Sequence, residues 1–124
     1  MRDGKHVILT IDDDPDYLEA IKTLLEANGY VVEQASSAET GLKIAQKVEP
    51  DLVIVDLMME EIDAGTSFVT DLRALGRSIP IYMLSSVGDQ LDRSTSYASL
   101  GLAGVFQKPI NPENLLRVLK EKLK

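Results

Sequence analysis

Short apolar runs alternate with amphipathic segments along the chain, and this alternation constrains the fold more than any other feature. The apolar runs have the length of strands, and the segments between them carry apolar residues at helical spacing. Strands that alternate with helices are typical of βαβ units and therefore of a parallel sheet. Right-handed crossovers place the helices on both faces of such a sheet. We therefore expect an α/β fold.

The pattern predicts five strands and five helices in strict alternation. The expected strands are residues 6–11, 30–35, 52–55, 79–84 and 104–107. The expected helices are residues 15 to about 28, 36 to about 48, 66 to about 75, 89–100 and 112–123. The run from Leu52 to Val55 is apolar at every position, as in a central parallel strand that is buried on both faces.

Capping residues support three of the helix starts. Asp14 precedes Pro15, and Asn111 precedes Pro112, so each pair predicts an N-cap followed by proline at the first helical position. Ser36 and Glu39 have the spacing of a capping box.

Length and composition limit the classes of protein that the chain can belong to. Its 124 residues suit a single domain over residues 1–124, and its hydrophobic share of 44% suits an ordinary globule. The absence of cysteine excludes disulfides and thiolate chemistry. The net charge of -7 argues against direct binding to nucleic acids. No apolar run approaches the roughly 20 residues of a membrane helix, and no export signal is evident, so we expect a cytoplasmic domain without membrane contact.

Polar residues that follow the predicted strands indicate where the chemistry lies. Asp12 and Asp13 follow the first strand, Asp56 follows the third, Ser85 follows the fourth and Lys108 follows the fifth. In doubly wound sheets, sites lie beyond the carboxyl ends of the strands. We therefore expect these side chains to converge at one edge of the sheet.

This set of side chains suits phosphoryl transfer assisted by a metal ion. Three neighbouring carboxylates repel one another, and a hard cation such as Mg²⁺, which prefers oxygen ligands, removes that repulsion. Asp12 and Asp13 fit the role of ligands, whereas Asp56 fits the roles of ligand and nucleophile, since carboxylates form aspartyl phosphates. Lys108 can offset charge on a bound phosphoryl group, and the Ser85 hydroxyl can donate a hydrogen bond to it.

Four motifs in register resemble the receiver domains of two-component response regulators, the CheY-like family. They are Ile-Asp-Asp-Asp-Pro at 11–15, Asp-Leu-Val-Ile-Val-Asp-Leu-Met-Met at 51–59, Leu-Ser-Ser at 84–86 and Gln-Lys-Pro at 107–109. The resemblance implies a (βα)5 doubly wound sheet of the flavodoxin-like type, with five parallel strands in the order 2-1-3-4-5. It also implies that Asp56 is the phosphoacceptor and that Asp12 and Asp13 form the acidic pair. The backbone carbonyl of Met58 is then a further Mg²⁺ ligand, while Ser85 and Lys108 contact the phosphate.

The resemblance also implies partners and a mode of action. A sensor histidine kinase or a phosphotransfer protein donates the phosphoryl group to Asp56, and the domain then switches an output surface that acts on a downstream output domain or protein. Receivers of this kind catalyse their own phosphorylation and dephosphorylation, and we class them as signalling switches rather than enzymes. The face formed by the fourth helix, fifth strand and fifth helix is where the resemblance places a homodimer, if one forms.

Two positions depart from the family pattern. Glu60 stands where the family usually has proline, so we expect altered metal affinity or phosphate lifetime. Val105 stands where the family often has Tyr or Phe, and the aromatic residue follows at Phe106. Strand alternation places Phe106 on the face opposite Val105, so the usual aromatic readout is not expected here.

Other interpretations of the same residues stay open at this point. The fold could serve as a receiver-like protein-binding module that is not phosphorylated. A phosphatase of the haloacid dehalogenase type would need Asp-x-Asp after a strand, which residues 56–58 do not supply. A flavodoxin would need a glycine- and hydroxyl-rich loop where this chain has Asp12, Asp13 and Asp14. The single histidine, His6, begins a strand and is interpreted as a structural or solvated residue.

Overall fold

A computed structural model of the 124-residue chain describes residues 4–56, 70–74, 79–86, 103–108 and 110–123. The five strands within this part form one sheet in the order β2-β1-β3-β4-β5, and every neighbouring pair is parallel. The strands are β1 (Val7–Ile11), β2 (Val31–Ala35), β3 (Leu52–Asp56), β4 (Ile81–Ser86) and β5 (Gly104–Lys108). The expected α/β fold and strand order are confirmed.

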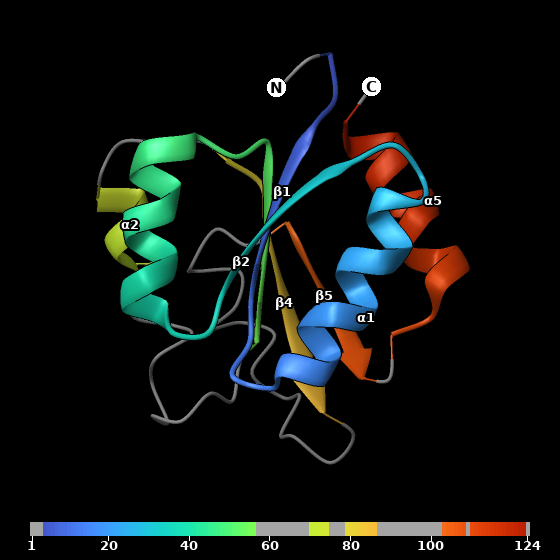
Figure 1. The fold of residues 1–124 in the computed structure, drawn as a ribbon, viewed down its shortest axis with the longest axis horizontal. Coiled ribbons are helices and arrows are strands. Elements are labelled where there is room, and N and C mark those ends of the chain that lie inside the picture. Colours follow the sequence, from blue (N-terminus) through green and yellow to red (C-terminus); the bar gives the residue numbers. More distant parts are fainter. Residues whose placement is uncertain (1–3, 57–69, 75–78, 87–102, 109, 124) are drawn as a thin grey trace.

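Helices cover both faces of the sheet (Figure 1). The helices with defined bounds are α1 (Pro15–Glu26), α2 (Ala38–Val48) and α5 (Pro112–Lys122), and residues 70–74 are also helical. The predicted helix over 66–75 is described only at 70–74, and the predicted helix over 89–100 lies outside the described residues. Among the described helices, none is both long and apolar enough to cross a lipid bilayer.

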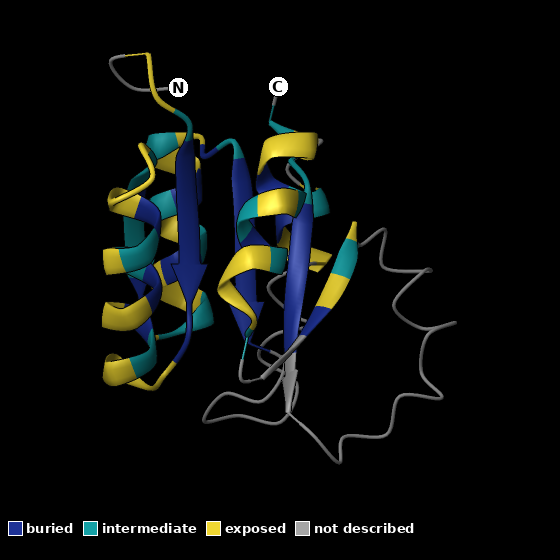
Figure 2. Cartoon of the chain, turned by 90° about the vertical axis from the view of Figure 1, so that its right-hand side faces the viewer, coloured by how far each residue is buried: buried dark blue, intermediate teal, exposed yellow. Residues whose placement is uncertain are grey.

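Two apolar clusters fill the space between the sheet and the helices. In one cluster, Leu25 of α1 and Leu115 and Leu119 of α5 pack against one face of the sheet. In the other, Ala45 of α2 and Leu72 pack against the opposite face. Strands β1 and β3 are buried at every residue, and Figure 2 shows them enclosed between the helices. The expectation that the third strand is buried on both faces is confirmed.

Local chemistry explains where the helices begin and end. The Asp14 side chain accepts hydrogen bonds from the amides of Asp16 and Tyr17, and the Asn111 side chain accepts one from Asn114, so both predicted N-caps are confirmed. The prediction of a capping box at Ser36 is wrong. Ser37 is the N-cap of α2, and its side chain accepts a hydrogen bond from the amide of Thr40.

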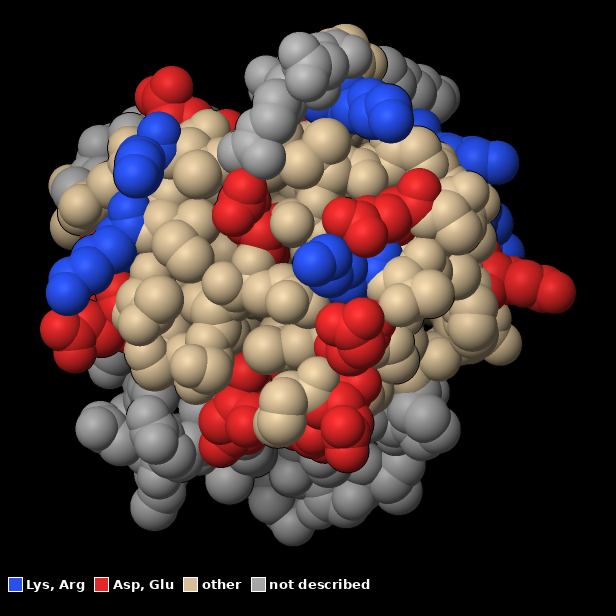
Figure 3. Space-filling view, in the orientation of Figure 1, with Lys and Arg blue, Asp and Glu red and all other residues tan. Residues whose placement is uncertain are grey.

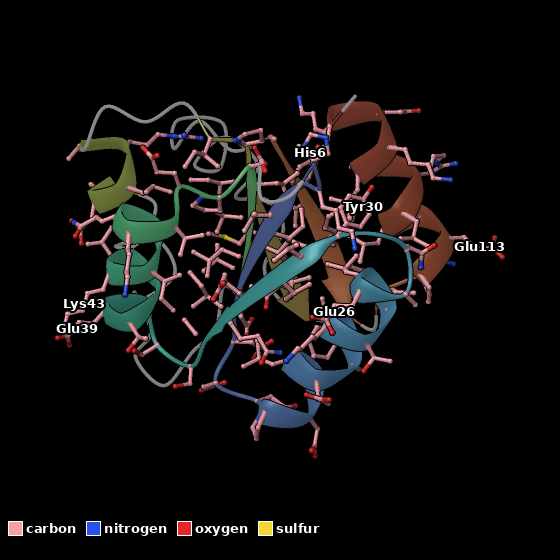
Figure 4. All side chains as sticks on the ribbon, turned by 45° about the horizontal axis from the view of Figure 1, so that its top comes forward. His6, Glu26, Tyr30, Glu39, Lys43 and Glu113 are labelled. Carbon is pink, nitrogen blue, oxygen red and sulfur yellow. The ribbon has the colours of Figure 1, made fainter. Side chains whose placement is uncertain are left out.

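The end of α1 and the first turn of α2 show two further features. Helix α1 ends at Glu26, two residues before the predicted end. On α2, Glu39 and Lys43 form an exposed i,i+4 ion pair at 3.4 Å, labelled in Figure 4.

The fourth and fifth strands differ from the prediction at their ends. Strand β4 begins at Ile81 instead of residue 79, because Pro80 has no amide hydrogen to contribute to the ladder. The Pro80 carbonyl still accepts a hydrogen bond from Val53 at 3.0 Å. Both β4 and β5 continue one or two residues further than predicted, so Ser85 and Lys108 belong to the strands themselves.

Asp51 fastens the start of β3 to the start of β1. Its carboxylate oxygen Oδ2 accepts a hydrogen bond from the Val7 amide at 2.8 Å, and its own amide donates to the Val7 carbonyl at 2.8 Å. The same carboxylate oxygen lies 3.8 Å from His6 Nδ1. The carboxylate thus satisfies a backbone amide at a residue that is buried.

We predict that Asp51→Ala lowers the free energy of unfolding by about 1–3 kcal/mol, because the Val7 amide loses its acceptor. Asp51→Asn keeps an acceptor oxygen and should lose clearly less. Urea denaturation followed by circular dichroism measures both variants. Equal midpoints for Asp51→Ala and the parent chain would contradict this role of the carboxylate.

Candidate functional site

The end of β1 delivers two carboxylates to the carboxyl edge of the sheet. Asp12 directly follows the strand, its amide donates to the Ala35 carbonyl at 3.1 Å, and only 1% of the residue is exposed. Asp13 is exposed. The chain leaves a buried strand at this point, so the first carboxylate stays inside and the second faces solvent.

The end of β3 delivers the third carboxylate beside them. Asp56 is the last residue of β3 and is 3% exposed. The parallel register pairs Ile11 with Val55, so the residues that follow each of them, Asp12 and Asp56, lie at the same level of the sheet. The carboxylates of Asp12, Asp13 and Asp56 each contribute an oxygen, and these oxygens all lie within 4.8 Å of one another.

A backbone contact positions the Asp12 carboxylate. The amide of Asp14 donates to Asp12 Oδ1 at 3.0 Å, while the Asp14 carboxylate caps α1. Asp14 therefore has two roles: its side chain caps α1, as predicted, and its backbone amide orients the Asp12 carboxylate, which was not predicted. The signal in the sequence is the aspartate at position 12 directly after the strand, since aspartate side chains commonly accept from the backbone amide two residues ahead.

The charge of this edge is strongly negative in the described part of the chain. Asp13, Asp14 and Asp16 are all exposed within one short segment. Figure 3 shows acidic side chains gathered over the beginning of α1, at the lower margin of that face. Two carboxylates 4 Å apart repel by about 1 kcal/mol in water and more strongly in less polar surroundings. Three oxygens so close together suit a hard divalent cation.

Of the other predicted site residues, the structure describes the backbone of Ser85 and Lys108. Ser85 and Lys108 lie in the last residues of β4 and β5, so the backbone brings both to the edge where Asp56 lies. Their side chains lie outside the described part of the structure, as does the whole of Met58. Glu60, the first departure from the family pattern, also lies outside it.

The second departure from the family pattern can be followed in the structure. Val105 is 38% exposed, whereas Phe106 is 5% exposed and packs in the cluster beneath α5. The prediction that the two side chains lie on opposite faces of the sheet is confirmed.

His6 lies away from the acid cluster. It precedes β1, whereas Asp12 follows that strand, and Figure 4 labels it at the amino edge of the sheet. Its ring nitrogen Nδ1 lies 3.8 Å from Oδ2 of Asp51. This position agrees with the interpretation of His6 as a structural residue.

Comparison with known proteins identifies the family. The sequence model of the family described as "Response regulator receiver domain" matches residues 8–120, which is nearly the whole chain. The chain belongs to the response regulator receiver domain family. This assignment supports the receiver interpretation over the phosphatase and flavodoxin interpretations.

Curated relatives and solved structures agree with this assignment. This receiver is 36% identical over 115 residues to the "Probable transcriptional regulator ycf27" of Cyanophora paradoxa, covering 93% of the chain and 47% of the relative. It is 35% identical over 111 residues to the "DNA-binding dual master transcriptional regulator RpaA" of a Synechocystis strain, covering 88% of the chain and 45% of the relative. The receiver thus spans about half the length of these two relatives.

Solved receivers have the same fold. A CheY-like receiver domain protein from Methanospirillum hungatei superimposes with a TM-score of 0.88 at 30% identity, covering 97% of this chain and 94% of that chain. The chemotaxis response regulator CheY4 of Vibrio cholerae gives a TM-score of 0.84 at 30% identity, covering 96% and 99%.

We predict that Asp13→Asn raises the free energy of unfolding by about 1 kcal/mol in metal-free buffer of low ionic strength, because it removes repulsion from Asp12 and Asp56. The gain should shrink as salt is added. Asp16→Asn is the control, because Asp16 favours the first turn of α1 and its neutralisation should be slightly destabilising. Urea denaturation at two salt concentrations measures both; a loss of stability in Asp13→Asn would contradict the repulsion.

Proposed function

We propose that this receiver accepts a phosphoryl group on Asp56 in a Mg²⁺-dependent reaction. The observation that carries the proposal is the meeting of Asp12, Asp13 and Asp56 at the ends of two neighbouring strands, in a chain of the receiver family. Asp56 is the last residue of the central strand β3, which is buried throughout, so the sheet holds its backbone in place beside the other two aspartates.

The proposed reaction transfers one phosphoryl group between two nucleophiles. An oxygen of the Asp56 carboxylate attacks the phosphorus of a donor, forming a P–O bond while the bond from phosphorus to the donor breaks. The donor is a phosphohistidine of a sensor histidine kinase or phosphotransfer protein, and its imidazole leaves with the bonding electron pair and takes up a proton. Water later attacks the phosphorus of the aspartyl phosphate, releases inorganic phosphate and restores the carboxylate.

Asp12, Asp13 and Asp56 would hold Mg²⁺, together with the backbone carbonyl of Met58. When bound, the ion neutralises charge on the carboxylates and on the phosphoryl oxygens. Ser85 would donate a hydrogen bond to a phosphoryl oxygen, and Lys108 would offset the remaining negative charge. Because the chain is modified in each cycle, we regard it as a switch and not as an enzyme acting on a separate substrate.

The output of the switch is a downstream domain or protein. The relatives named above are described as transcriptional regulators and extend well beyond the matched region. We propose a cytoplasmic signalling role in which phosphorylation changes the surface presented to such an output partner. A homodimer through the fourth helix, β5 and α5 stays a prediction, as does the single-domain organisation of residues 1–124.

We predict that incubation with acetyl phosphate and Mg²⁺ adds one phosphoryl group, measured by intact mass, and that chelation of the metal prevents the addition. Asp56→Asn should gain no phosphoryl mass, because the nucleophile is removed. Asp16→Asn is the matched control and should react like the parent chain. An undiminished addition in Asp56→Asn would contradict the assignment. No addition in the parent chain would favour the non-phosphorylated binding module.

We also predict that Mg²⁺ stabilises the folded receiver, since a ligand that binds only the native state adds about 2.7 kcal/mol at 100 times its Kd. Thermal unfolding across a Mg²⁺ titration measures the effect. Asp13→Asn should lose most of this gain, whereas Asp16→Asn should keep it. An equal gain in both variants would show that Mg²⁺ binds elsewhere.

A further inference from the structure

We propose that phosphorylation of this receiver is transmitted to α5 through the buried ring pair of Tyr82 and Phe106. This inference rests on the proposed function, because it names the route by which the acid site acts on the rest of the domain. The two rings stack with centroids 5.1 Å apart and an interplanar angle of 27°. Both are almost completely buried, with exposed fractions of 6% and 5%.

The ring pair belongs to the two strands that carry the predicted phosphate contacts. Tyr82 lies on β4 three residues before Ser85, and Phe106 lies on β5 two residues before Lys108. The ladder pairs Leu84 with Phe106, then continues to the ends of both strands. Backbone hydrogen bonds couple β4 to β5 along the ladder. A shift of the strand ends toward a phosphoryl group would therefore also displace the residues that carry the two rings.

Gly104 makes the Tyr82 ring sensitive to the position of β5. The register places Gly104 directly opposite Tyr82, and a Cβ at this glycine would lie 2.8 Å from Tyr82 Cε2. The ring therefore lies against the β5 backbone on one side and against the Phe106 ring on another. Close-packed groups of this kind do not deform continuously, so a change in the stagger of the two strands must repack them.

Helix α5 lies on the other side of the ring pair. Tyr82, Phe106, Leu115 and Leu119 are buried in one cluster, and both leucines are fully buried on α5. Burial, and to a smaller extent the negative charge of Glu121, raise the pKa of the Tyr82 phenol. Tyr82 thus interacts with the last turns of α5 as well as with its central leucines. Repacking of the rings would therefore be felt over much of the helix.

The test uses beryllofluoride with Mg²⁺ as a phosphoryl mimic on the full chain. Fluorine NMR detects bound beryllofluoride and, after incorporation of 3-fluorotyrosine, also detects the Tyr82 ring. We expect binding to shift the Tyr82 signal and to change amide hydrogen exchange in α5 by about tenfold, a size typical of allosteric coupling. Exchange in α2, which packs on the opposite face of the sheet, serves as the internal control.

Two variants on β5 separate the ring pair from the general stiffness of the strand. Phe106→Leu should bind beryllofluoride but lose most of the α5 response, whereas Val105→Ala, on the exposed side of the same strand, should keep it. A response in Phe106→Leu equal to that of the parent chain would overturn the inference. If Phe106→Leu does not fold, the parent chain still decides, since a silent Tyr82 signal or an unchanged α5 with beryllofluoride bound would reject it.

The failure of the proposed function is recognisable in the same experiment. Absence of a bound beryllofluoride signal in the parent chain, or its persistence in Asp56→Asn, would overturn the proposed site and this inference together. Binding that depends on Asp56 while α5 stays unchanged would overturn the inference alone.

Discussion

The parallel pairing of β1 with β3 is the constraint on which the rest of the structure depends. The two strands are buried at every residue and pair from Ile8 with Leu52 to Ile11 with Val55. A slip of one residue would exchange the side chains between the two apolar clusters, one on each face, and the close packing of both clusters would be lost. That register in turn places Asp12 and Asp56 side by side. The packing of the apolar core thus sets the positions of the aspartates at the edge of the sheet.

The site runs against the preferences of the fold that carries it. Asp12 and Asp56 are nearly inaccessible to solvent, and buried carboxylates are costly unless they are paired, hydrogen-bonded or bound to a cation. The amide of Asp14 compensates part of this cost at Asp12. Conflicts between local preference and global fold concentrate at functional sites, and the acid cluster is the clearest such conflict in the described part of this chain.

Much of the fold and the core of the site could be predicted because both depend on local pattern. Apolar runs of strand length, the caps at Asp14 and Asn111, and the acids after two strands are all visible in the sequence. The position of Phe106 opposite Val105 followed from the period of a strand.

Features set by tertiary contacts were not predictable in this way. The hydrogen bond from the Val7 amide to the Asp51 carboxylate joins residues 44 positions apart. The residues around Asp51 in the sequence do not distinguish it from a surface acid. Glu49 ends α2 with φ of 54°, in the left-handed region where glycine is usual, so sequence preference gave no sign of it. Tyr82 and Phe106 become a pair only because Gly104 leaves room for the Tyr82 ring on the neighbouring strand.

The central claim is that carboxylates from β1 and β3 hold one divalent cation at the carboxyl edge of the sheet. Paramagnetic broadening of backbone amides by substoichiometric Mn²⁺, a close substitute for Mg²⁺ at oxygen sites, tests it most directly. The account predicts that the amides of Asp12, Asp13 and Asp56 broaden first, while those of His6 and Asp51 at the opposite edge stay sharp. Selective broadening at the opposite edge, or none at the three aspartates, would contradict it.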